Sequence, residues 1–290
     1  MRALRTRIYG VSVVQNEADI VGESLERAAR FCEQIWVWDL GSADGTWDVL
    51  TSLKLPNVSA CQRREEYRSS LRGRVFEENR SSVAPDSWIY ILDADEFLVG
   101  DPRPVLETAE EEGTSLVGAW QANFFPTEAD LKRLQAVGEE QWARTPIANR
   151  LRHYRVEWFE WRFVRALPDL AWDTSGIYSR IRHADGRPLR AAKQGMIVRH
   201  YRYRTPNQVS LRVSTRARGT LDRRFRYDRT GVFERQVRPA DECLLWPEEQ
   251  AELVVPRSEI LRGRFRRLAG LLLRRIQRTA RRIMSRIPES

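Results

Sequence analysis

Two aspartates in the first third of the chain have the spacing expected of a cation site. Asp93 and Asp95 flank Ala94 and follow the apolar run 88–92. Residues two apart on a strand point to one face, so both carboxylates can converge on one ligand. A hard divalent cation held there would bridge protein oxygens to phosphate oxygens and neutralise charge on a departing diphosphate. The alternative is a solvated turn, or carboxylates that cap a nearby helix.

Polar residues also end two earlier apolar runs. Asn16 and Glu17 follow the run 8–14, and their types suit a ligand site and a helix N-terminus equally well. Asp39 lies near the end of the run 34–40, where its carboxylate can accept hydrogen bonds from a nucleotide base or ribose. Its alternative role is a cap on the helix that starts at Thr46.

The first hundred residues alternate strand and helix patterns. Apolar runs at 8–14, 34–40, 58–61 and 88–92 are separated by segments with helical patterning. This order predicts an α/β fold whose mostly parallel, Rossmann-like nucleotide-binding sheet carries helices on both faces. Ligand sites in such sheets lie at the carboxyl ends of the strands, where the polar residues above are found.

The pattern is less regular beyond residue 100. A helix is predicted over 104–112, a strand over 115–125 and a helix over 127–137, with Thr127 and Asp130 in capping-box spacing. Thr205, followed by a proline and by Gln208, marks another helix start. Residues 150–200 are rich in Trp, Tyr and Arg and show no clean periodicity.

The basic charge of the chain is confined to its end. The net charge is +9, and residues 257–290 alone hold eleven arginines against two glutamates, which also gives +9. Apolar residues recur there at helical spacing from Leu261 and Phe265 onward. We predict a basic amphipathic helix on an anionic membrane surface; a helix packed on the domain and an RNA-binding arm are the alternatives. The rest of the chain is neutral, so no nucleic-acid partner is expected.

The cysteines and the apolar runs bear on the compartment. Three cysteines without C-x-x-C spacing predict neither a disulfide scaffold nor a zinc site. The first apolar run is short and lacks a cleavage pattern, and no segment reaches the ~18–20 apolar residues of a membrane span. A cytoplasmic protein, peripheral at the inner face of the membrane, is the expectation.

Three segments together resemble family-2-type glycosyltransferases of the GT-A fold. Residues 13–17, followed by Asp-Ile-Val at 19–21, are similar to the opening of these enzymes. Residues 38–46 resemble their D-D-G-S-x-D-G-T turn, with Leu40 where a second Asp is usual. Residues 91–97 resemble their metal-binding D-x-D, in a variant that ends D-E-F. The order and spacing match over residues 8–100.

The resemblance implies a nucleotide-diphosphate sugar donor and a bound Mn²⁺ or Mg²⁺. Asp39 would contact the nucleoside, Asp93 would lie by the ribose and metal, and Asp95 would ligate the metal. Asn16 and Glu17 would complete the donor site. Glu96 should point to the opposite face in a structural role.

The later half resembles the family less specifically. His200 lies in a segment similar to a late His-Tyr segment of related enzymes, and is either a further metal ligand or a packed side chain. Arg202 or Arg204 would clamp phosphate oxygens unless they are solvated. An inverting transferase also needs a general base, for which Asp173 is chosen; the other acidic residues considered are Glu157, Glu160 and Asp169.

These patterns predict a nucleotide-sugar-binding half over 1–115, an acceptor-binding and catalytic half over 116–256, and a helical tail over 257–290. The expected activity is transfer of a sugar to a hydroxyl of a saccharide or lipid-linked acceptor. A metal-dependent nucleotidyltransferase is the first alternative, although no glycine-rich phosphate loop is present. A non-catalytic protein that binds nucleic acid or membrane through the tail is the second.

Overall fold

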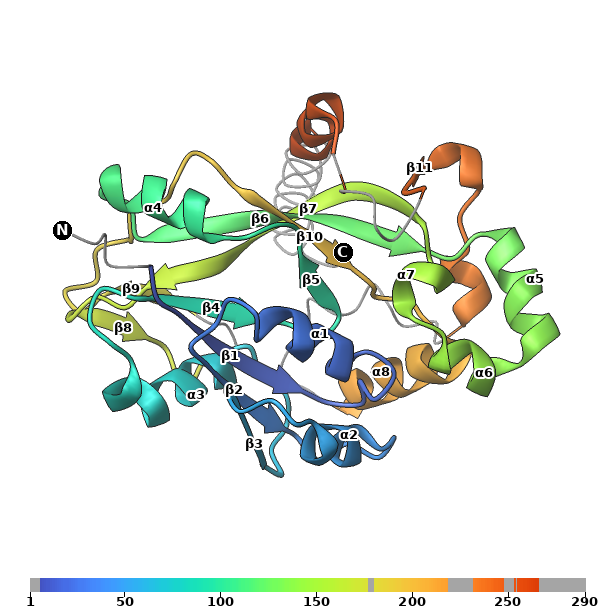
Figure 1. The fold of residues 1–290 in the computed structure, drawn as a ribbon, viewed down its shortest axis with the longest axis horizontal. Helices are drawn as coiled ribbons and strands as arrows, with labels where there is room; N and C mark the ends of the chain where they lie inside the picture. Colours follow the sequence, from blue (N-terminus) through green and yellow to red (C-terminus); the bar gives the residue numbers. More distant parts are fainter. Residues whose placement is uncertain (1–5, 177–179, 219–231, 248–252, 254, 266–290) are drawn as a thin grey trace, which may run out of the picture.

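The computed structural model of the chain describes residues 6–176, 180–218, 232–247, 253 and 255–265. A mixed β-sheet forms its centre (Figure 1), with strand order β3-β2-β1-β4-β7-β6-β10-β5 and β11 paired to β7. The first four strands pair in parallel and are β1 (Ile8–Val14), β2 (Gln34–Asp39), β3 (Val58–Gln62) and β4 (Trp88–Leu92). Every residue of β1 and β4 is buried, as the apolar runs predict.

The remaining strands extend this sheet with mixed directions. They are β5 (Glu96–Leu98), β6 (Leu116–Phe125), β7 (His153–Arg165), β10 (Met196–His200) and β11 (Leu244–Leu245). β7 runs antiparallel to both β4 and β6, and β10 is parallel to β6 but antiparallel to β5. A small second sheet pairs β8 (Leu170–Trp172) with β9 (Ile181–His183). The predicted α/β fold class is confirmed, and its continuous parallel part, β3-β2-β1-β4, comes from the first hundred residues.

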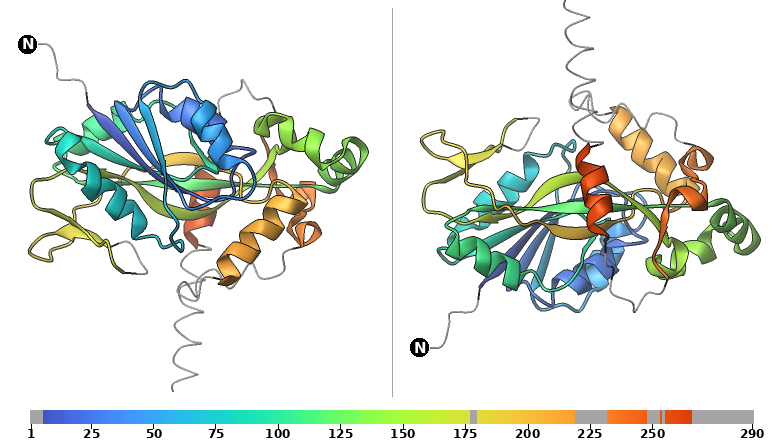
Figure 2. Two further views of the ribbon diagram at one scale, coloured as in Figure 1. Left: turned by 90° about the horizontal axis from the view of Figure 1, so that it is seen from below. Right: turned by 90° about the horizontal axis from the view of Figure 1, so that it is seen from above.

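Helices lie on both sides of the sheet (Figure 2). The helices α1 (Val21–Ala28), α2 (Thr46–Ser52) and α4 (Arg103–Glu111) share one apolar core with β1, β2 and β4. The opposite core contains α3 (Leu71–Asn79), which is followed by a 3₁₀ turn at Arg80–Ser82. A third core involves α5 (Glu128–Val137), α6 (Glu139–Arg144), α7 (Ile147–Arg150), α8 (Pro206–Arg218) and the 3₁₀ turn Phe233–Gln236. A further 3₁₀ turn spans Ala240–Glu242.

Two of the three predicted helix caps are confirmed. Thr127 and Asp130 form a reciprocal capping box at α5, and Thr205 Oγ1 accepts from the backbone N–H of Gln208 at 3.1 Å. The prediction that Asn16 caps α1 is wrong. Asn16 has a left-handed backbone with φ of 59°, and its side-chain oxygen accepts from the backbone N–H of Ala43 instead.

Two β-bulges interrupt the ladder between β6 and β7. The register shifts between Gln121 and Ala122, opposite Glu157, and again between Val117 and Gly118, opposite Arg162. A bulge leaves its extra residue out of the regular pairing and re-aims that side chain. Both bulged residues of β7 carry charges that enter the site described below.

The first residues of the predicted tail are helical over 257–265. A Cβ added at Gly263 would lie 3.1 Å from the carbonyl oxygen of Val156, so this helix lies directly against β7. Leu261 and Phe265 remain 60% and 75% exposed. The rest of the tail lies outside the described residues, and within them no helix combines the length and apolarity needed to cross a membrane.

Candidate functional site

Asp93 and Asp95 lie in the turn that joins β4 to β5, at the carboxyl end of the parallel strands. Asp95 is buried, and its Oδ2 accepts from Arg212 Nη1 of α8 at 2.8 Å. The same oxygen lies 3.3 Å from His200 Nε2 at the end of β10. Burial alone would raise the pKa of Asp95, but His200 and Arg212 outweigh it and hold the pKa well below its usual range. Asp95 is therefore a carboxylate at neutral pH.

A chain of hydrogen bonds orients the imidazole of His200. Its Nδ1 lies 2.7 Å from Asn123 Oδ1, while Asn123 Nδ2 donates to Glu157 Oε2 at 3.3 Å. The carboxylate can only accept, so it orients the amide with its oxygen toward the imidazole, which must then donate through Nδ1–H. Nε2 faces Asp95 Oδ2 as a hydrogen-bond partner of that carboxylate, so a metal ion bound between them would take the place of the proton on Nε2. A carboxylate and an imidazole nitrogen that converge in this way match a metal-ligand pair with an outer support.

Asp93 is held between two arginines from different elements. Arg72 of α3 contacts its Oδ1, and Arg162 Nη2 of β7 lies 3.2 Å from its Oδ2. Burial opposes ionisation, but these two guanidinium groups lower the pKa of Asp93. Both oxygens therefore have cationic partners, which makes Asp93 less available to a metal than Asp95.

Arg162 also supports the back of the site. Its Nε donates to Glu96 Oε2 at 2.6 Å, and Gln121 Nε2 donates to Glu96 Oε1 at 2.6 Å. Glu96 is 1% exposed, and its burial raises its pKa. These contacts agree with the structural role predicted for Glu96.

The ends of β1 and β2 are tied together beside the aspartates. The backbone N–H of Asn16 donates to Ser42 Oγ at 2.8 Å, and that hydroxyl in turn donates to Asp39. Gly45 is the N-cap of α2, and the backbone N–H of Thr46 donates to Asp44 Oδ1 at 3.0 Å, while no backbone N–H of α2 is recorded on Asp39 in the described structure. The alternative role of Asp39 as a helix cap is therefore wrong.

A hollow of about 370 Å³ opens beside the turn that follows β2. Its walls are Leu40, Gly41, Ser42, Gln62, Arg64 and Glu65. Ser42 and Gln62 both donate to the buried carboxylate of Asp39. The walls of the hollow are mostly polar, and Asp39 itself is buried behind them and does not line it.

Glu17 belongs to a buried cluster of charges at the start of α1. Arg204 is fully buried and contacts Glu17 and Asp19, and Asp19 also accepts from Arg150 Nη1 at 2.9 Å. Burial raises the pKa of Glu17 to about 7 although Arg204 opposes this. Arg204 is neither a phosphate clamp nor a solvated side chain, because its buried guanidinium is occupied by these carboxylates and by the backbone of Tyr201.

The acidic residues proposed as general base lie in different surroundings. Asp173 follows β8, and its Oδ1 accepts from the backbone N–H groups of Ser175 and Gly176 at 3.0 and 2.9 Å. Glu160 lies in β7, where its Oε2 is 3.0 Å from Arg162 Nη2 and its side chain is 42% exposed. Burial would raise the pKa of Glu160, but Arg162 outweighs it and lowers the pKa.

The residues present can supply part of the ligand set of a hard divalent cation. Within the described ranges no group of three or more His, Cys, Asp or Glu side chains converges on one point. Asp95 and His200 supply two ligands, and a cation such as Mg²⁺ is commonly bound by one or two protein groups with waters and substrate phosphates filling the other positions. The donor set therefore fits a cation that arrives with a diphosphate.

Sequence reasoning missed the arginines of the site. Arg72, Arg162 and Arg212 contact the two aspartates, yet none belongs to a motif. Arginine is frequent along the whole chain, so its presence carries no positional signal. Asn123 was missed for a similar reason, since it lies inside an apolar strand pattern without a spacing rule.

Comparisons with known proteins give similarity to solved structures only. No protein-family model matches the chain, and no curated protein does. The mannosyltransferase PcManGT from Pyrobaculum calidifontis, in complex with GDP-Man and Mn²⁺, matches at 14% identity over 80% of this chain and 69% of its own, with a TM-score of 0.41. Mannosyl-3-phosphoglycerate synthase from Rubrobacter xylanophilus matches at 20% identity over 57% of this chain, with a TM-score of 0.31. This chain spans 55% of that synthase.

A third match is glucosyl-3-phosphoglycerate synthase from Mycobacterium tuberculosis, in complex with Mn²⁺, UDP and glucosyl-3-phosphoglycerate. Its identity is 14%, over 57% of this chain and 58% of its own, with a TM-score of 0.28.

Proposed function

We propose that this protein is a metal-dependent glycosyltransferase that moves a sugar from a nucleotide-diphosphate donor to a hydroxyl acceptor, with inversion. The observation that carries the proposal is the pair formed by ionised Asp95 and His200, whose Nε2 faces that carboxylate at the carboxyl end of the parallel sheet. The three ordered motifs of residues 8–100 support it independently.

Different residues of the site bind different parts of the donor and its cation. The hollow beside Asp39 takes the nucleoside, with Asn16 holding the turn that forms its wall. Asp95 and His200 hold Mn²⁺ or Mg²⁺, and Asp93 stays beside it, with Glu17 in the adjoining buried cluster. The cation, when bound, stabilises negative charge on the departing diphosphate. Arg72, Arg162 and Arg212 keep the carboxylates ionised and in place.

We propose Glu160 as the base that takes the proton of the acceptor hydroxyl. Glu160 is ionised, is reachable from solvent, and contacts the arginine that also holds Asp93. Trp158 Nε1 donates to its other oxygen at 2.9 Å and fixes its orientation. Asp173 stays the alternative base. Its backbone packs against α3, since a Cβ added at Gly73 would lie 2.8 Å from the carbonyl oxygen of Asp173.

A thermal-shift screen with UDP, GDP, CDP and dTDP in Mn²⁺ tests the proposed activity. We expect one nucleotide to stabilise the wild type, and Asp95→Asn or His200→Gln to weaken its binding by about tenfold or more, because each removes a ligand. Asp185→Asn, an exposed aspartate in another turn, is the matched control and should leave the shift unchanged. Melting each variant without nucleotide separates a folding defect from lost binding. Indifference of the wild type to all four nucleotides would overturn the proposal.

The tail supports a further part of this proposal, peripheral attachment to an anionic membrane with a lipid-linked acceptor. The exposed Leu261 and Phe265 lie on the described start of a helix flanked by Arg257, Arg262 and Arg264. Replacing both apolar residues by glutamine should weaken flotation with phosphatidylglycerol vesicles by about tenfold, through lost apolar burial. Val137→Gln, at a 51% exposed site on α5, is the control. Equal flotation of the tail variant and wild type would contradict the membrane role.

A further inference from the structure

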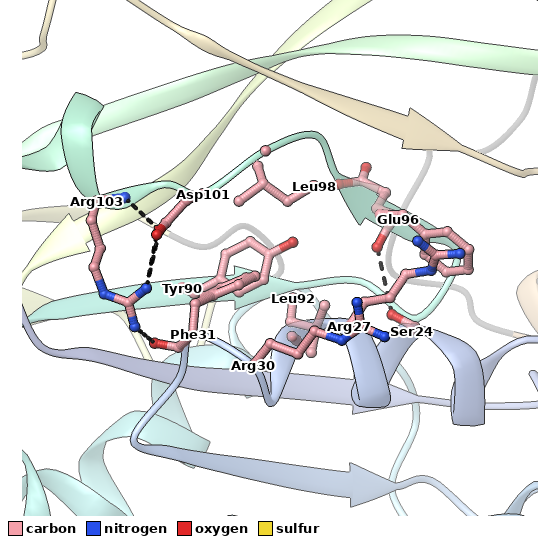
Figure 3. Close-up of a pocket in the computed structure, with 13 residues that line it drawn as sticks. Ser24, Arg27, Arg30, Phe31, Tyr90, Leu92, Glu96, Leu98, Asp101 and Arg103 are labelled. Atoms are coloured by element: carbon pink, nitrogen blue, oxygen red, sulfur yellow. Dashed lines mark hydrogen bonds and ion pairs between the residues drawn. The ribbon is translucent and has the colours of Figure 1, made fainter. Parts of the chain in front are cut away.

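A second cavity, of about 310 Å³, lies on the other side of β4 from α3 (Figure 3). It is bordered by α1, by β4 and β5, and by the loop that leads to α4. Tyr90 and Leu92 of β4 line it, whereas their neighbours Ile89 and Ile91 face the core that contains α3. None of the residues proposed to bind the donor borders it; Glu96, which supports Arg162 behind the donor site, does, and its carboxylate is already bound to Arg162 and Gln121. The donor-site proposal therefore leaves this cavity unassigned.

The hydroxyl of Tyr90 opens into this cavity. Tyr90 is 1% exposed, and its ring stacks on Phe163 with centroids 4.7 Å apart. Within the described part of the chain its hydroxyl has no hydrogen-bond partner, and the hydroxyl end of the ring points among the lining residues in Figure 3. Burial, reinforced by the nearby Glu96, raises the pKa of Tyr90 well above its ordinary value, so the group stays a donor. The hydroxyl is open to the cavity, where a ligand atom can accept its hydrogen bond.

Three arginines line the cavity, and two of them are already neutralised. Arg27 pairs with Glu23 at 3.0 Å, and Arg103 pairs with Asp101 at 3.0 Å. Arg30 is exposed and, among the described residues, makes neither an ion pair nor a hydrogen bond. One uncompensated positive charge thus remains at the cavity, beside the apolar side chains of Phe31, Leu92 and Leu98.

We propose that this cavity binds a small organic carboxylate with an apolar body. The carboxylate lies against Arg30, the body packs on Phe31 and Leu98, and a second acceptor atom takes the hydrogen bond of Tyr90. A single free cation favours a monoanion, and a nucleoside diphosphate carries more negative charge than the lining can balance. Ligand-detected NMR can measure this binding without any nucleotide, so its failure is separate from failure of the proposed transferase activity.

The test compares 3-phenylpropanoate with its neutral amide, 3-phenylpropanamide, on the full chain. Wild type should bind the acid at least about fivefold more tightly than the amide, through one charge-assisted contact. Arg30→Gln should abolish this preference, and Tyr90→Phe, which keeps the stacked ring, should weaken both probes. Arg144→Gln, an exposed arginine of α6, is the matched control and should bind as wild type does.

Three results would overturn the proposal. The first is no binding of either probe at a few millimolar, and the second is equal affinity of the wild type for acid and amide. The third is an equal loss of affinity for the acid in Arg144→Gln and Arg30→Gln. An unchanged affinity of Tyr90→Phe for both probes would place the ligand elsewhere on the surface and would overturn it as well.

Discussion

Replacing Arg204 by methionine is expected to lower the free energy of unfolding by about 3–5 kcal/mol. Arg204 is fully buried, its Nε donates to Asp19 at 3.0 Å, and its terminal nitrogens contact Glu17 and Asp19. Methionine fills part of the volume but leaves two buried carboxylates with less positive charge. Among the described residues, Arg150 then remains as the hydrogen-bonded cation of Asp19. Chemical denaturation followed by circular dichroism measures the loss.

The pH dependence of this loss gives a second, sharper measurement. Burial already raises the pKa of Glu17 to about 7, and removing Arg204, which opposes that shift, raises it further. The folded variant then keeps a proton that the unfolded chain releases near pH 4.3, so its stability falls as pH rises through this range. In the wild type, the contribution of Glu17 to this loss of stability ends near pH 7, where the folded protein also releases the proton. The deficit of the variant should therefore be larger at pH 8 than at pH 6.

A matched control comes from the surface. Arg144 pairs with Glu140 at 2.7 Å, but both side chains are more than two-thirds exposed. Arg144→Met should change the free energy of unfolding by less than about 1 kcal/mol, because exposed ion pairs contribute little. A loss below about 1 kcal/mol in Arg204→Met, or one independent of pH, would contradict the role assigned to the buried cluster.

The parallel half of the fold could be predicted because local pattern and tertiary environment agree there. The run at 8–14 is apolar throughout, and β1 is buried throughout. The polar residues at the ends of β1, β2 and β4 were likewise predicted to converge, since parallel strands end at one edge. The hydrogen bonds between Asn16 and the turn after β2 show this convergence.

The later half could not be predicted as far, and β7 shows why. The bulges at Glu157 and Arg162 interrupt its alternation of buried and exposed residues. The sequence therefore shows no continuous period-2 pattern that would predict the strand. The order of the strands in the sheet also cannot be predicted from local sequence patterns. β7 pairs between β4 and β6, whereas β5, which follows β4 in the chain, pairs with β10 at the edge of the sheet. The contacts of Arg72 and Arg212 depend on that order and could not be found from spacing.

The second large effect is expected for Glu160→Gln, which should lower kcat for nucleotide-sugar turnover by about 10²–10⁴-fold. Glutamine keeps the size of the side chain and can still accept from Trp158, but it cannot take a proton from the acceptor. Release of nucleoside diphosphate with water as acceptor measures this step without knowledge of the natural acceptor. Donor binding should change little, because Glu160 does not contact Asp95 or His200 in the described site.

Asp173→Asn is the discriminating partner variant. Its Oδ1 serves a turn with Ser175 and Gly176, and an amide oxygen can accept the same two hydrogen bonds, so kcat should stay within about threefold of wild type. The reverse result, a large loss in Asp173→Asn with Glu160→Gln active, would return the base to Asp173. A purely structural role of Glu160 would instead reduce nucleotide-induced stabilisation, since Arg162 would then release Asp93. The thermal shift and kcat together therefore separate proton transfer from support of the site.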